Sequence, residues 1–166
     1  YWAENKDVEE PLDVRHYNAI GKISHALSQH ADEAFEELTP TGKEIAAVLF
    51  KSITEKGNDT FGVRRPMLLS KIAEIAAVEE QDLIEVIEVF RGKGRSIIMP
   101  AAHIPLNSSS LIEVSHESLM RIWVRLKNWV DEEFESAQMY KRLSDAAAMY
   151  QVGKTGLWRP PDLQLA

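Results

Sequence analysis

Apolar side chains recur every three or four residues over most of the chain, which is the period of an amphipathic helix. The first such stretch covers Val14–Leu38 and contains Gly21 as a weak point or close contact. Thr39 is followed by Pro at a first helical position, so a second helix is predicted to start there. Its apolar positions continue to Ile53, and the helix is predicted to stop near Gly57.

A short segment, Phe61–Val63, leads to two further predicted helices, Met67–Ala77 and about Glu79–Phe90. The turn between these helices is so tight that they should cross rather than form a long hairpin. Strands are predicted at Ser96–Met99 and Leu111–Val114, with residues 100–110 as an exposed loop between them. Helix, short strand, two helices and a hairpin with a long tip is the order of a winged helix-turn-helix domain.

Helical periodicity returns after this hairpin. An apolar stripe predicts helix over His116–Tyr150, either unbroken or bent near Asp131. We therefore expect a mainly α fold with a winged helix-turn-helix core and a small β-hairpin. The predicted domains are an N-terminal helical segment (residues 1–38), the winged-helix domain (39–115) and a C-terminal helical linker (116–166).

Composition narrows the class of protein. The chain has 166 residues, of which 45% are hydrophobic and 27% charged, the balance of a soluble globular protein. No apolar run reaches the roughly 18–20 residues that a membrane-spanning helix needs. The chain has no cysteine, which excludes disulfides and thiolate sites and fits a cytoplasmic location. It begins at Tyr1 without a processing signal, so we expect a segment of a longer protein.

Charge argues against the DNA-binding function that a winged helix-turn-helix order suggests. The net charge is −7, and phosphate backbones are bound mainly by Lys and Arg. The second helix of the pair would be the recognition helix. The basic residue near its end is Arg91. Five acidic residues lie along it: Glu79, Glu80, Asp82, Glu85 and Glu88. These charges favour a protein-interaction role. A winged-helix DNA-binding regulator is the alternative.

Motifs for catalysis are incomplete. Gly153-Lys154-Thr155 matches the end of a phosphate-binding loop, but Ala148 stands where that loop needs Gly, and a helix precedes it. A loop that ends a helix is the simpler interpretation. His116-Glu117 begins a zinc-protease motif that lacks the second His, because Met120 occupies its position. We predict no metal site and no catalytic residue.

Trp123 and Trp129 lie on the C-terminal stripe with Leu119 and Leu126. Core packing explains such a stripe. A docking surface for a neighbouring domain is the alternative, and it would make the chain prone to self-association.

These residues together resemble a known family. Ile112–Leu119, followed by Trp123, Leu126 and Trp129, is similar to the V-x-H-E-x-L…W-x-x-L…W signature of bacterial STAND NTPases, which are signal-transduction ATPases with numerous domains. Arg64 and Arg65 lie where those proteins carry a paired Arg. Other stretches resemble the helical segment after the ATPase core and the join to C-terminal repeats: residues 16–21, 26–27, 30–31, 38 and 157–163.

The resemblance implies a regulatory function. The chain would be the helical and winged-helix portion, without catalysis of its own, and ADP or ATP would bind only in the full-length parent. His116 would sense the ADP phosphate together with the ATPase core, although related ATPases have Met-His-Asp where this chain has Ser115-His116-Glu117. Trp123, Trp129, Arg64 and Arg65 would contact neighbouring domains. Expected partners are the ATPase core and a C-terminal repeat domain, such as WD repeats, of the same chain.

Overall fold

The computed structural model describes residues 22–56, 62–92, 94–154 and 156. The beginning of the first predicted helix lies outside these residues, as does the predicted join at 157–163. The chain divides between Val130 and Asp131 into two compact units. The predicted domain boundaries after residues 38 and 115 stay predictions.

The first described helices are α3 (Lys22–Glu36) and α4 (Pro40–Ser52). Thr39 caps α4, because its Oγ1 accepts a hydrogen bond from the Gly42 backbone N–H over 3.1 Å. Pro40 occupies the first helical position, where its missing N–H has no cost. The start predicted for this helix is confirmed.

Helices α5 (Leu69–Ala76) and α6 (Glu80–Arg91) are joined by the tight turn predicted from the sequence. Ala77 adopts the left-handed conformation with φ 53°. Its N–H donates to the Glu74 carbonyl, and the Val78 N–H donates to the Ala73 carbonyl. This pair of bonds is the Schellman arrangement that satisfies the last carbonyls of a helix.

A three-stranded antiparallel sheet has the order β3-β5-β4. Its strands are β3 (Met67–Leu68), β5 (Leu111–Val114) and β4 (Ile98–Met99). The predicted hairpin is confirmed, with the first strand shorter than expected because Ser96 has a positive φ of 45°. Met67 was expected to begin a helix, but it pairs with Ile112, so α5 starts two residues later.

A second, two-stranded sheet pairs β1 (Thr54–Lys56) with β2 (Gly62–Arg64). Strand β1 was not predicted, because its residues follow the helical stripe of α4 without a visible break. Thr54 marks the change, since its hydroxyl donates to the Phe50 carbonyl over 2.6 Å at the end of the helix. The described part of the chain is thus mainly helical with small antiparallel sheets.

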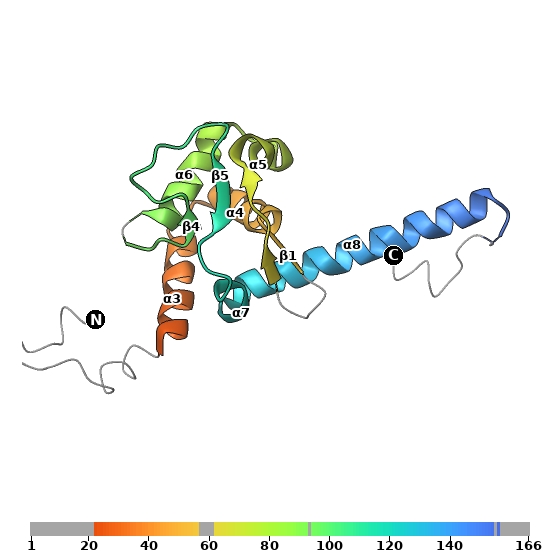
Figure 1. The fold of residues 1–166 in the computed structure, drawn as a ribbon, viewed down its shortest axis with the longest axis horizontal. Helices are drawn as coiled ribbons and strands as arrows, with labels where there is room; N and C mark the ends of the chain where they lie inside the picture. The colour runs from red at the N-terminus through yellow and green to blue at the C-terminus, as the bar shows by residue number, and fades with distance from the viewer. Residues whose placement is uncertain (1–21, 57–61, 93, 155, 157–166) are drawn as a thin grey trace, which may run out of the picture. The chain divides into compact units, whose positions relative to one another are not determined.

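The core of the first unit lies among α3, α4, α5, α6, the three-stranded sheet and the chain from Leu119 to Val130. Figure 1 shows α4, α5 and α6 gathered beside β5. Arg91 is buried at the end of α6, where it donates to Glu88 and to the carbonyls of Pro100 and Ala101. The loop after β4 is thereby fixed to α6. The largest buried side chains include Trp123, Phe50, Phe90, Leu49 and Ile53.

The helix predicted over His116–Tyr150 is wrong in two respects. It starts at Leu119 rather than His116, as α7 (Leu119–Ile122), and it is interrupted at Trp123 rather than near Asp131. Trp123 is extended, with φ −84° and ψ 102°. Helix α8 then covers Val124–Gln151, so it belongs to both units. Its last turn ends at Gly153, whose φ is 70°.

Candidate functional site

His116 lies on the surface, in the connection between β5 and α7. Two backbone bonds fix this connection: Ser115 N–H donates to the Ile97 carbonyl over 3.0 Å, and Leu119 N–H donates to the His116 carbonyl over 3.1 Å. The sequence predicts a helix that begins at His116. The following helix instead begins three residues later and contains four residues.

Arg64 lies close to this connection. Strand β2 places its guanidinium 3.8 Å from a carboxylate oxygen of Glu113 and 3.8 Å from one of Glu117. The structure thus brings Arg64 next to the residue that follows His116. All three charged side chains retain solvent exposure, so these ion pairs orient the side chains more than they stabilise the fold.

Arg65, the second residue of the predicted pair, does not share these partners. Its backbone N–H donates to the Ile53 carbonyl over 2.8 Å, and its side chain is exposed. Successive residues of an extended chain point to opposite faces, which separates the two guanidinium groups.

Trp123 and Trp129 are placed by core packing. Trp123 is 0% exposed, and its ring centroid lies 5.0 Å from that of Phe50 and 5.7 Å from that of Trp129 in edge-to-face arrangements. Trp129 is partly buried and lies 5.5 Å from Phe35. Trp123 therefore offers no surface to a neighbouring domain, contrary to the docking interpretation, whereas Trp129 retains some exposure.

A polar cluster beneath Trp123 was missed by the sequence analysis. Asp32 accepts a hydrogen bond from the indole Nε1–H over 2.8 Å and a weaker one from Arg125 Nε over 3.4 Å. Arg125 also donates to Glu36 over 3.1 Å, and its guanidinium lies 4.0 Å from the centre of the Phe35 ring. About ninety residues separate the partners, so no local pattern announces the cluster.

The pKa of Glu36 in this cluster is lowered. A hydrogen bond from Lys43 is the main reason that the pKa of Glu36 lies below its ordinary value, and the charges of Lys43 and Arg125 act in the same direction. Partial desolvation opposes this lowering. The cluster therefore favours an ionised Glu36 at neutral pH.

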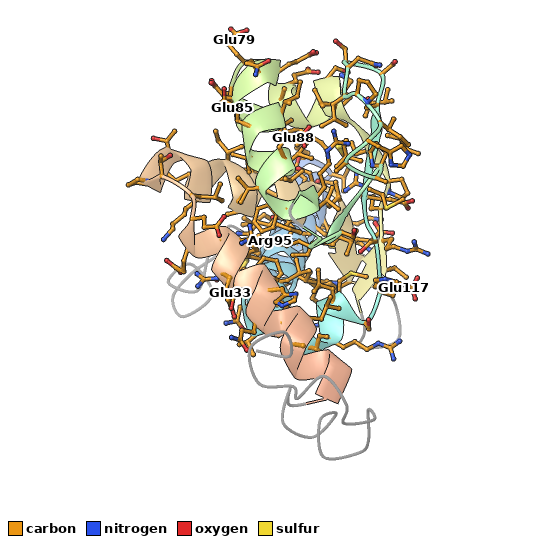
Figure 2. The ribbon with its side chains drawn as sticks, turned by 90° about the vertical axis from the view of Figure 1, so that its left-hand side faces the viewer. Glu33, Glu79, Glu85, Glu88, Arg95 and Glu117 are labelled. Atoms are coloured by element: carbon orange, nitrogen blue, oxygen red, sulfur yellow. The ribbon has the colours of Figure 1, made fainter. Side chains whose placement is uncertain are left out.

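Acidic side chains dominate the surface of α6. Glu79, Asp82, Glu85 and Glu88 are all exposed. Figure 2 shows Glu79, Glu85 and Glu88 along this helix, well separated from Glu117. A helix with this surface would repel the phosphates that border a DNA groove.

The Gly153-Lys154 motif terminates a helix. Gly153 ends α8, because its N–H donates to the Tyr150 carbonyl and the Lys154 N–H donates to the Met149 carbonyl. This confirms the interpretation as a loop that ends a helix, while Thr155 lies outside the described residues. Within the described ranges, no three His, Asp or Glu side chains are grouped as metal ligands.

None of the helices in the described part of the chain combines the length and apolar composition that crossing a membrane requires.

Comparison with known proteins identifies the family. The family model described as Novel STAND NTPase 1 matches residues 1–156. No curated protein and no solved structure matches the chain. Because the match covers far more than half of the sequence, the chain belongs to the Novel STAND NTPase 1 family.

Proposed function

We propose that the chain is the regulatory winged-helix portion of a STAND-type signalling ATPase and that it senses the ADP-bound state through His116. Family membership supports the parent activity. The order of α4, α5 and α6 followed by the β4–β5 hairpin, with β3 as third strand, is compatible with a winged helix.

The exposure of His116 is the observation that carries the sensing role. Its imidazole is accessible to another domain, while the backbone on both sides of it is fixed, to Ile97 just before β4 and to Leu119 at the start of α7. Arg64 forms an ion pair with Glu117, so the carboxylate that follows the histidine in the sequence already has a cationic partner. An imidazole N–H in such a position can donate to a phosphate oxygen that another domain presents.

In this proposal the chain does not hydrolyse nucleotide, and ADP or ATP is held by an ATPase core in the same protein. The partners are that core and C-terminal repeats such as WD repeats, in a bacterial, cytoplasmic protein. Arg64, Arg65 and the exposed part of Trp129 are the candidate contacts between domains. Self-association of the chain is a further expectation, and sedimentation at rising concentration would reveal it.

The test compares two exposed histidines in a protein that contains both this chain and the ATPase core. A hydrogen bond to a charged group contributes about 1.5–3 kcal/mol, so His116→Ala should weaken ADP binding about ten- to a hundredfold and speed ADP release. His103→Ala, in the loop between β4 and β5, is the matched control and should leave ADP release unchanged. Equal off-rates for both variants and the unmodified protein would leave His116 without a sensing role.

Calorimetry on the isolated chain gives a second check. One histidine contact is too weak to hold a nucleotide whose base, sugar and remaining phosphates are unbound. We therefore expect no saturable ADP binding by residues 1–166 alone. Tight binding would contradict the assignment, because it would require a nucleotide site within this chain.

The alternative is a winged-helix DNA-binding regulator, which the helix order favours and the acidic surface of α6 disfavours. Fluorescence anisotropy with random-sequence duplex DNA at physiological ionic strength separates the two functions. Salt-dependent binding would favour the DNA-binding function. We expect none.

A further inference from the structure

The helical chain is interrupted at Trp123 although its sequence contains no helix breaker there. Residues 119–130 include neither Gly nor Pro, the usual causes of a sharp break. The apolar residues Leu119, Trp123, Leu126 and Val130 follow a spacing of four, three and four, and all four are buried. In one continuous helix these side chains would share a single face. The local sequence is thus compatible with a helix that passes through Trp123.

The interruption leaves backbone groups without helical partners. The first N–H groups of a helix have no carbonyl four residues earlier to bond, and in α8 these belong to Val124, Arg125 and Leu126. The regular pattern resumes at Lys127, whose N–H donates to the Trp123 carbonyl over 3.0 Å. A continuous helix would recover the missing bonds, so contacts from elsewhere in the fold must favour the interruption.

Those contacts converge on the Trp123 side chain. Its indole N–H donates to Asp32 of α3 over 2.8 Å, and its ring packs 5.0 Å from Phe50 of α4 and 6.2 Å from Phe90 of α6. We call Asp32, Phe50 and Phe90 the Trp123 seat. Arg125, two residues later, adds its own bonds to Asp32 and Glu36. The seat fixes the indole and the start of α8 to three helices at once.

We propose that Trp123 is a two-state joint. In one state the Trp123 seat holds the indole and separates α7 from α8, and in the other state residues 119–130 form one helix. Asp32 is the switch residue, because its carboxylate bonds both the indole and Arg125 on the far side of the joint. A change of state alters the direction in which the chain continues after Trp123. The proposal holds whether or not the chain senses nucleotide.

Nuclear magnetic resonance on the uniformly labelled chain of 166 residues tests the joint. Saturation-transfer and relaxation-dispersion experiments detect a minor state populated at about 0.1–10%. We expect exchange at Ile122–Leu126 to a state whose Trp123 Cα shift is helical. Asp32→Ala should raise its population most. Asp32→Asn should raise it less, because the amide oxygen still accepts the indole N–H while the charge for Arg125 is lost.

Val124 provides a matched pair of variants that leaves the seat intact, since its side chain is 66% exposed. Val124 is the first residue of α8 in the interrupted state and an interior residue in the continuous helix, where helix propensity has its full effect. In a helix interior Ala is more favourable than Val, and Gly is less favourable. Val124→Ala should therefore raise the helical minor state, and Val124→Gly should lower it, about twofold each. This pair tests the joint through helix propensity alone.

Each outcome decides the proposal. Populations in the order Ala, Val, Gly at residue 124, with Asp32→Asn above the unmodified chain, would support a two-state joint. Should Asp32→Ala fail to fold, Asp32→Asn and the Val124 pair still give the answer. The absence of a second state in Asp32→Asn and Val124→Ala would overturn the joint, as would a minor state with unfolded rather than helical shifts.

Discussion

The indole Nε1–H of Trp123 donates to Oδ1 of Asp32 over 2.8 Å, although the two residues are 91 positions apart in the sequence. Trp123 is 0% exposed, and Asp32 accepts the hydrogen bond of its N–H in the folded chain. A bond of this kind fixes α3 to the start of α8 with a geometry that apolar packing alone does not impose.

Removal of this acceptor should destabilise the fold. Asp32→Ala leaves a buried donor unsatisfied, which costs about 1–3 kcal/mol in the free energy of unfolding. Glu33→Ala, the exposed neighbour on α3, is the control and should change stability by less than about 0.5 kcal/mol. Urea denaturation followed by circular dichroism measures both. Equal midpoints for the two variants would show that solvent or another acceptor replaces Asp32.

Ala77→Gly should stabilise the turn between α5 and α6. A residue with a Cβ costs about 1–2 kcal/mol in the left-handed conformation, and Ala77 has φ 53°. The greater conformational freedom of Gly in the unfolded chain offsets about 0.5–1 kcal/mol of this stabilisation. We expect a net increase of about 0.5–1 kcal/mol in urea denaturation. Ala47→Gly, within α4, is the opposite control and should lower stability; a loss in both variants would contradict the turn geometry.

Local patterns predicted the elements whose causes are local. The cap at Thr39, the hairpin ending in Val114 and the helix end at Gly153 follow from neighbouring residues, and the structure confirms them. Strand β1 was missed because the helical stripe of α4 continues into it without a visible break, although its partner β2 follows closely in the sequence. The interruption at Trp123 was missed because it depends on distant contacts from α3, α4 and α6.

The candidate site likewise contains residues that the sequence predicted and residues that it did not. The sequence predicted Arg64 and His116 as residues of interest, and the structure places Arg64 3.8 Å from Glu117, the residue that follows His116. Asp32, Glu36 and Arg125 gave no signal, because ordinary charged residues on two amphipathic helices are typical of solvated faces. These residues are far apart in the sequence. They form a cluster because α3 packs against the chain after Trp123.

Arg91 should be important for the loop after β4. Its side chain is 2% exposed and donates to the Pro100 carbonyl over 3.1 Å and to the Ala101 carbonyl over 3.2 Å. Arg91→Met preserves the length of the side chain but removes every donor, so we expect a loss of about 2–3 kcal/mol. Lys71→Met, which removes an exposed pair with Glu74, should change stability by no more than about 1 kcal/mol.

Hydrogen exchange locates the effect of Arg91→Met. Faster exchange should appear in residues 100–110, and it should not appear in Lys71→Met. Similar stability losses in the two variants, or unchanged exchange in this loop, would show that the carbonyls of Pro100 and Ala101 do not depend on the guanidinium.

Glu36 should make stability depend on pH in the acidic range. Its pKa is lowered in the folded chain by the hydrogen bond and charge of Lys43 and by the charge of Arg125, against an opposing desolvation. A carboxyl whose folded pKa is depressed contributes stability above its unfolded pKa and loses it as the pH falls through the folded pKa. Glu36→Gln should therefore lower the free energy of unfolding near neutral pH, and the difference from the unmodified chain should shrink below the ordinary value of 4.5. Glu44→Gln, exposed on α4, is the control and should leave this part of the profile unchanged. Urea denaturation between acidic and neutral pH measures the effect, and a difference that grows as the pH falls would reverse the sign and exclude Lys43 as the partner that matters.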